Sequence, residues 1–417
     1  MSAAAGWRAG LAYGGLGLPL AFVALPLYIV LPNHYATQYG VPLAALGALL
    51  LAARLLDAVA DPWIGRLADR WFAGPASRLL AVAALAAVCL ALGFAALFHP
   101  PVRTLGALLA WCGAALLVTY LAYSVLSVVH QAWGARLGGD ARQRTRIVAW
   151  REGAALTGVL LASVLPAWVG LDVTSVVLAF ALAAGVALLA LARRASPARV
   201  IGGAGARPWR DAAFRRLMLV FIVNGTASAV PATLVLFFIR DRLQLPDSQA
   251  MFLFSYFAAG ALSMPLWVRL VAPLGLAGAW MLGMLLAVAA FVGAATLGEG
   301  DRAGFLVVCI ASGLALGADL ALPSALLAGV IQRSAYAGRA EGVYFGWWNF
   351  AAKLNLALAA GLALPLLGLA GYAPGSRDPA ALQALTLAYC LLPCALKLLA
   401  AALLWGLGLQ RHEARFA

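Results

Sequence analysis

Charged side chains are scarce in this chain of 417 residues: Asp, Glu, Lys and Arg make up only 11% of it, whereas 65% of it is hydrophobic. With a mean hydropathy of +0.94, this composition excludes an ordinary soluble globular protein. The apolar runs approach roughly 20 residues, the length of a membrane-spanning helix and about twice that of a barrel strand. Because backbone polar groups in hydrocarbon must be satisfied within the segment, we predict an all-α polytopic membrane protein.

Acidic residues are scarcer than basic ones, 15 against 29, and the only lysines are Lys353 and Lys397. A net charge of +14 is compatible with nucleic-acid binding, but the placement of the charges argues against it. Twenty arginines fall in loops on one side of the predicted membrane and five on the other. The positive-inside rule then places both termini in the cytoplasm. The basic excess therefore reflects topology and contact with anionic lipid, and we expect no nucleic-acid partner.

Cysteine is rare, with five residues that all lie in apolar runs, and no His or carboxylate neighbours complete a metal-binding set. The sequence also lacks a nucleophile–base pair and a glycine-rich phosphate loop, which argues against an enzyme. We therefore expect no cofactor and no resident metal. The first apolar run continues for about 20 residues without a small-residue cleavage site, so it predicts a retained helix and not a signal peptide.

The apolar runs divide the chain into about twelve predicted spans. Their ranges are 11–32, 43–66, 78–98, 104–134, 147–170, 174–192, 214–239, 248–270, 277–297, 303–331, 341–370 and 380–408. A polar stretch rich in Arg, Gly and Pro separates six spans from six. This predicts an N-terminal six-helix half (1–192), a cytoplasmic linker (193–213) and a C-terminal six-helix half (214–417), the arrangement of a major facilitator transporter.

Charged residues inside the second span mark the first candidate site. Asp57 and Asp61 are four residues apart, so on a helix they share a face, with Arg54 one turn before Asp57. Charges at membrane depth are costly and point to function. Two carboxylates so close together are typical of a cation or proton site. An internal salt bridge between Arg54 and Asp57 is the structural alternative.

The end of the same span carries a second pattern, in which Gly65 is followed by Asp69 and Arg70. Small-x-x-x-Asp-Arg after the second of twelve spans resembles the loop signature of the major facilitator superfamily. It predicts a cytoplasmic gate made of a helix end and salt bridges. An ordinary basic loop is the alternative.

Two further spans carry candidate substrate-binding residues. At the start of the fifth span, Trp150 lies beside Arg151, and an indole next to a guanidinium suits polar ligands; the alternative is an arginine that reaches the membrane interface. In the eleventh span, Trp348 and Asn349 precede Lys353. A buried ammonium needs an anionic partner, which the acids of the second span can supply. Asp319, in the tenth span, has no partner that the sequence identifies.

Three segments resemble the glycoside–pentoside–hexuronide:cation symporter family, the melibiose-permease-like branch of the major facilitator superfamily. They are DAVADPWIGRLADR, LGGDARQRTRIVAWRE and EGVYFGWWNFAAKLNLALAAGLALPLLGLAGY. The resemblance covers the whole chain and implies the major facilitator fold. It implies cation binding by Asp57 and Asp61 and a substrate-binding role for Arg151. It also implies that Lys353 takes part in ion coupling and in substrate binding. A tyrosine of the family aligns with Tyr120.

The sequence departs from the sugar carriers of that family at several positions. Ala60 replaces a polar amide between the acids, Leu121 and Ser124 stand where a threonine and an acid are expected, and span 11–32 carries no charge. The coupling ion, proton or sodium, and the choice between sugar and amphiphile therefore stay open.

We expect a secondary active symporter of a small solute, such as a sugar or glycoside, that works by alternating access. A transporter of a lysolipid or another amphiphile is the alternative. We expect a monomer in the lipid bilayer of a bacterial inner membrane. No metal beyond a transported sodium ion at the paired acids of the second span is expected.

Overall fold

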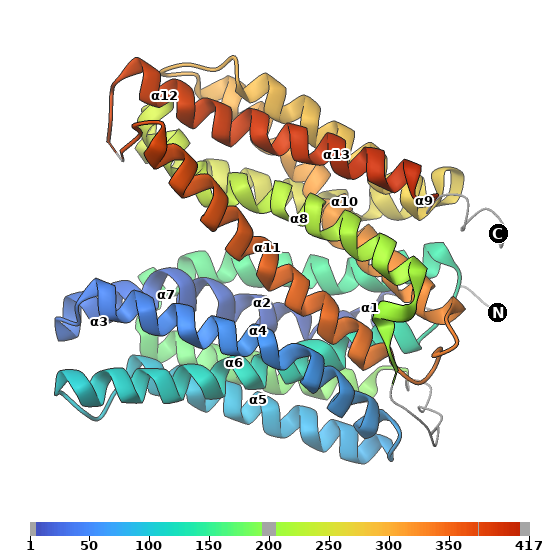
Figure 1. Cartoon of the computed structure of the whole chain (residues 1–417). Helices are drawn as coiled ribbons and strands as arrows, with labels where there is room; N and C mark the ends of the chain where they lie inside the picture. The colour runs from blue at the N-terminus through green and yellow to red at the C-terminus, as the bar shows by residue number, and fades with distance from the viewer. Residues whose placement is uncertain (1–5, 194–205, 374, 409–417) are drawn as a thin grey trace. The chain divides into compact units, whose positions relative to one another are not determined.

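The computed structural model describes residues 6–193, 206–373 and 375–408, and this part of the chain is helical with no β-strand (Figure 1). The α-helices are Trp7–Gly14 (α1), Gly17–Leu25 (α2), Leu31–Tyr39 (α3), Leu43–Phe72 (α4), Ala76–Phe98 (α5), Leu105–Arg136 (α6), Ala141–Leu191 (α7), Ala212–Phe237 (α8), Gln249–Ala294 (α9), Arg302–Arg333 (α10), Glu341–Leu369 (α11), Pro379–Thr386 (α12) and Leu392–Gly406 (α13). Short π-helical segments at Pro26–Val30 (η1), Phe238–Arg242 (η3) and Leu387–Leu391 (η5) join or extend some of them. The all-α prediction is confirmed.

The helix lengths agree with membrane spans. Within the described residues, eight helices are long and apolar enough to cross a membrane, and the pair α1 and α2, bent by 42°, adds a ninth. Two predicted pairs of spans fall within α7 and α9, and each of these elements consists of two helices joined at a kink. Gly170 and Gly275 turn the chain within these two elements at φ values of 77° and 68°, in the left-handed region that glycine favours.

The first residues of several helices are held by acidic caps. Asp140 accepts a hydrogen bond from the backbone N of Gln143 at the start of α7 (2.7 Å), and Asp211 does the same for Ala213 at the start of α8 (2.9 Å). Such caps satisfy backbone N–H groups that have no partner inside the helix. These acids are therefore used locally.

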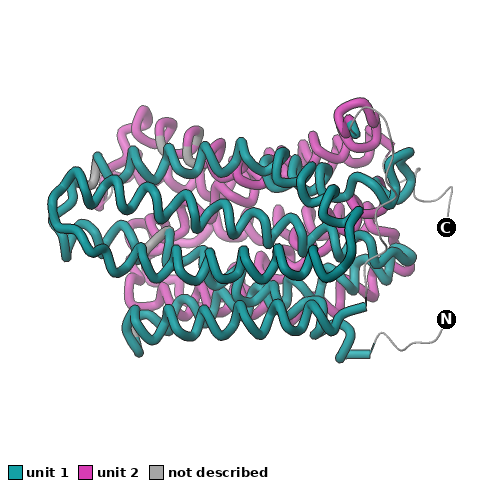
Figure 2. The backbone as a smooth tube through the Cα atoms, turned by 90° about the horizontal axis from the view of Figure 1, so that it is seen from below, with its two compact units in different colours: residues 1–206, 331–350 teal, residues 207–330, 351–417 magenta. Residues whose placement is uncertain are grey.

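The chain divides into two compact units (Figure 2). Met1–Ala206 and Ile331–Phe350 belong to unit 1, and Arg207–Val330 and Ala351–Ala417 belong to unit 2. Unit 1 therefore includes the first ten residues of α11. Residues 194–205 of the predicted linker lie outside the described part, and the proposed boundaries of the two halves stay a prediction.

Each unit has its own helix packing. In unit 1, α7 packs against α1, α2 and α5, and α6 packs against α4 and α5. In unit 2, α13 packs against α8 and α9. The core of unit 2 is rich in aromatic rings: Phe238 stacks on Tyr389 with ring centroids 4.3 Å apart, and Phe305 meets Phe252 edge-on at 4.8 Å. Such pairs add to the stabilisation from buried area alone.

Candidate functional site

The paired acids of α4 are buried within unit 1. Asp57 is 5% exposed and Asp61 is fully buried. Asp57 accepts a 2.7 Å hydrogen bond from the hydroxyl of Ser124, which is on α6. α4 continues as a helix across Pro62, so the proline does not interrupt the face that carries both acids. The acids therefore lie inside the protein, where a charge is tolerated only with suitable partners.

The buried arginine of α7 lies in the same unit. Arg151 is 7% exposed, and its Nε donates to Glu152 at 2.9 Å. The start of the chain packs closely here: a Cβ on Gly17 would lie 2.5 Å from the carbonyl oxygen of Arg151, so only glycine fits. Trp150 lies just before it, half-buried, and Tyr120 is buried on α6. Unit 1 thus holds a buried guanidinium as well as buried carboxylates.

The candidate residues of α11 fall in both units. Trp348 and Asn349 are buried in unit 1, whereas Lys353 is half-buried and belongs to unit 2. The predicted pairing of Lys353 with the α4 acids stays a prediction.

A charged cluster joins the end of α4 to the start of α11 within unit 1. Arg136, at the end of α6, donates a hydrogen bond to Asp69 at 3.0 Å and forms an ion pair with Glu341, with 2.8 Å between nitrogen and oxygen. Asp69 also accepts the backbone N–H groups of Gly342 (2.8 Å) and Val343 (2.9 Å). The carboxylate therefore caps the first turn of a helix that begins more than 270 residues later.

Glycines bring α4 and α11 into backbone contact beside this cluster. A Cβ on Gly65 would lie 2.3 Å from the carbonyl oxygen of Gly342, and one on Gly346 would lie 2.4 Å from that of Asp61. Small residues allow such close approach between membrane helices. Arg70, the last predicted gate residue, is exposed. The structure thus brings Gly65 and Asp69 to the start of α11 and leaves Arg70 at the surface.

Sequence reasoning missed two members of this cluster, Arg136 and Glu341. Arg136 is one of the twenty arginines that the sequence places in loops on the cytoplasmic side, yet it is 5% exposed, and its guanidinium lies over the ring of Phe72, 4.3 Å from the centroid. Its position at the very end of an apolar span is typical of an interfacial arginine, so the sequence carries no signal for its burial.

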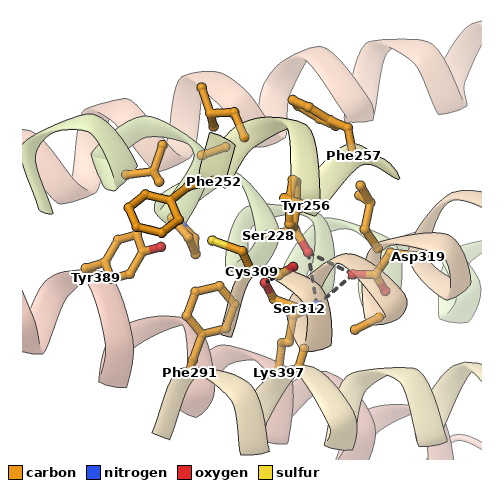
Figure 3. A pocket seen from close by; sticks show the side chains of 17 residues that line it. Ser228, Phe252, Tyr256, Phe257, Phe291, Cys309, Ser312, Asp319, Tyr389 and Lys397 are labelled. Atoms are coloured by element: carbon orange, nitrogen blue, oxygen red, sulfur yellow. Dashed lines mark hydrogen bonds and ion pairs between the residues drawn. The ribbon is translucent and has the colours of Figure 1, made fainter. Parts of the chain in front are cut away.

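Unit 2 contains an ion pair between a buried lysine and a largely buried acid that the sequence did not predict (Figure 3). Lys397 on α13 donates to Asp319 on α10 at 2.7 Å, and it also donates to Asn224 and Ser228 of α8, each at 3.0 Å. Asp319 accepts three further hydrogen bonds, from Asn224 (3.0 Å), Ser228 (2.9 Å) and Trp280 (3.0 Å). Lys397, one of only two lysines, was the available signal, and Asp319 was the acid without an assigned partner.

A cavity of about 130 Å³ lies beside this ion pair within unit 2. Its polar end is formed by Ser228, Asp319 and Lys397, and its walls are largely aromatic and aliphatic (Figure 3). The aromatic lining residues are Phe252, Tyr256, Phe257, Phe291 and Tyr389.

Comparisons with known proteins agree with this fold. The sequence profile of the family described as MFS/sugar transport protein matches residues 10–411. The inner membrane symporter YicJ of Escherichia coli is 26% identical over 162 residues, which is 38% of this chain; the match spans 34% of that relative's length.

Solved structures share the fold over nearly the full chain. A bacterial homologue of the iron transporter ferroportin, in an outward-facing state, aligns with a TM-score of 0.72 at 16% identity, over 96% of this chain and 99% of that one. The human organic anion transporter MFSD10 aligns with a TM-score of 0.66 at 18% identity, over 95% of this chain and 99% of that one. The fucose:proton symporter FucP of E. coli aligns with a TM-score of 0.65 at 13% identity, over 94% of this chain and 97% of that one. At these identities the likeness concerns the fold alone.

Proposed function

Because this chain belongs to the MFS/sugar transport protein family, a family of membrane transporters and not of enzymes, we propose that it is a symporter of a small solute. The solute is a sugar or glycoside, and it moves together with a proton or a sodium ion. The chain works as a monomer in a bacterial inner membrane with both termini in the cytoplasm. The observation that carries this proposal is the pair of buried acids, Asp57 and Asp61, one turn apart on α4.

The roles follow from charge and burial. Asp57 and Asp61 take up the coupling ion. An internal salt bridge would need only one carboxylate, whereas this helix face carries two. Arg151, Tyr120 and Trp150 bind the solute together with Trp348, Asn349 and Lys353 of α11. Asp69, Arg70 and Gly65 form the cytoplasmic gate. Contacts between α4 and the start of α11 would form and break as the transporter alternates its access.

The first experiment identifies the ligand. Purified protein is heated with melibiose, methyl glucoside or lysophosphatidylcholine, each at two pH values with and without sodium. A ligand that binds the folded state raises the melting midpoint by mass action. We expect a sugar to raise the midpoint in a manner that depends on sodium or pH. If neither sugar raises it under any of these conditions, the sugar assignment is wrong.

The second experiment tests the coupling role in proteoliposomes with the solute found above. We expect Asp61→Asn to abolish uptake driven by an ion gradient. Asp172→Asn is the matched control, because the Asp172 side chain is 86% exposed and its loss leaves uptake unchanged. Normal gradient-driven uptake by Asp61→Asn would contradict the proposal.

One observation favours a second candidate, transport of a lysolipid or another amphiphile. The first predicted span, 11–32, carries no charged residue to hold sugar hydroxyls. In the melting experiment this candidate predicts a raised midpoint with lysophosphatidylcholine and none with the sugars.

A further inference from the structure

The cavity of unit 2 is bounded by α8, α9, α10, η5 and α13, and it shares no residue with the set proposed above for transport. We propose that it is a separate binding site for a small uncharged aromatic molecule that carries a hydroxyl group, of about the size of phenol. Size, charge and hydrogen bonding of the lining residues each point to this class.

Size favours a ligand of one ring. The cavity volume is about 130 Å³, close to the roughly 150 Å³ of an engineered apolar cavity that binds benzene. A disaccharide or a lysolipid would extend well beyond this volume. Five aromatic side chains line the walls, and they favour an aromatic guest through edge and face contacts between rings.

Charge excludes an ionic ligand. Asp319 and Lys397 at the polar end neutralise each other at 2.7 Å. Lys397 already donates to three acceptors, and Asp319 accepts from four donors. A charged guest would be buried without a counter-ion of its own, which is strongly unfavourable.

Two tyrosines are the reason why we propose a guest molecule with a hydroxyl group. Tyr256 and Tyr389 both line the cavity (Figure 3), and Tyr389 is 4% exposed. The hydrogen bonds of the described residues include none to either phenolic hydroxyl, and neither oxygen is among the fully enclosed polar atoms without a partner. Both hydroxyls therefore face the open space of the cavity, where a guest hydroxyl can exchange a hydrogen bond with them.

The test measures ¹⁹F NMR binding of three probes to the full-length protein in detergent: 4-fluorophenol, fluorobenzene and 4-fluorobenzoate. We expect 4-fluorophenol to bind about fivefold more tightly than fluorobenzene, because one hydrogen bond is worth roughly this factor. We expect no binding of 4-fluorobenzoate. Equal affinity for all three probes would overturn the proposal.

Two variants locate the site. Ala287→Phe fills the cavity, since Ala287 lines it and is 3% exposed, and we expect it to abolish binding of 4-fluorophenol in the same micelles. If Ala287→Phe binds as the unaltered protein does, the probe lies elsewhere and the proposal fails. Tyr389→Phe keeps the shape of the cavity, and we expect it to bring the affinities of 4-fluorophenol and fluorobenzene to within about twofold of each other.

Tyr336→Phe, which removes the same atom in unit 1, is the matched control and keeps the fivefold difference. A full fivefold difference in Tyr389→Phe and in Tyr256→Phe would overturn the assignment of the hydroxyl group. Transport by the α4 acids is measured separately, so neither result depends on the other.

Discussion

Unit 1 buries Asp57 and Asp61 one turn apart on a single helix, whereas unit 2 pairs Asp319, whose side chain is 12% exposed, with a buried lysine from another helix. Around Asp319, an ammonium and three neutral donors fill the acceptor sites of the carboxylate. The charge is balanced inside unit 2, which suits a group that fixes the positions of helices. The α4 face places two acids together, which suits a group whose charge changes during function. Burial alone therefore does not identify a coupling residue.

The largest expected effect comes from breaking the ion pair of unit 2. Lys397→Ala leaves Asp319 buried without its cation, and we expect a loss of roughly 3–5 kcal/mol in stability. Replacing both partners, as in Asp319→Leu with Lys397→Met, removes the buried charge and is expected to recover most of this loss. Thermal unfolding of the purified variants measures both. A double variant as unstable as Lys397→Ala would show that the pair does not act as a unit.

The next effect concerns the charged cluster of unit 1. Arg136→Ala leaves Asp69 and Glu341 without the guanidinium between them. We expect a loss of roughly 2–3 kcal/mol, since Asp69 keeps its two backbone donors. Thermal unfolding is again the measurement. Arg142→Ala, at an exposed position, serves as the control and leaves the midpoint unchanged; an equal loss in both variants would contradict the assignment.

A smaller effect is expected from the glycine contact. Gly65→Ala places a Cβ 2.3 Å from the carbonyl oxygen of Gly342, so α4 and the start of α11 must separate. Overpacking of this kind costs roughly 1–3 kcal/mol, and we expect uptake in proteoliposomes to fall as well. Gly47 lies on the same helix with nothing within 4 Å of an added Cβ. Gly47→Ala should therefore retain stability and uptake, and a matching loss there would point to a general effect on the helix.

The smallest expected loss of stability comes from a change at Asp57. It distinguishes most directly between an acid that takes up the coupling ion and an acid that fixes the positions of helices. Asp57→Asn keeps an oxygen that accepts the hydrogen bond from Ser124, so we expect it to cost less than about 1 kcal/mol. The same change removes a charge from the proposed coupling pair, so driven uptake should be lost. Uptake and unfolding are measured on the same preparation. A variant that unfolds easily but still transports would reverse the roles given to the two units.

The sequence predicted the helices well because hydrophobic run length is a local property. All twelve predicted ranges overlap helical segments, with ends that differ by a few residues, and the fold class is confirmed. Which charges meet across helices is not local. Lys397 reaches Asn224 over 173 residues of sequence, and no single sequence fixes the rotation of one helix against another. The burial of Arg136 was missed for the same reason, because an arginine at the end of a span is explained equally well by topology.

The cap that Asp69 provides for α11 also bears on how the chain is assembled. The first N–H groups of a helix need acceptors from outside it, and Ala340, directly before α11, has no side-chain acceptor. The carboxylate that serves Gly342 and Val343 comes from a helix synthesised far earlier. During synthesis from the N-terminus, α4 is therefore already made when α11 emerges. The first turn of α11 therefore gains its cap only when α11 packs against α4. Whether this turn is ordered then shows whether the chain has reached its final arrangement.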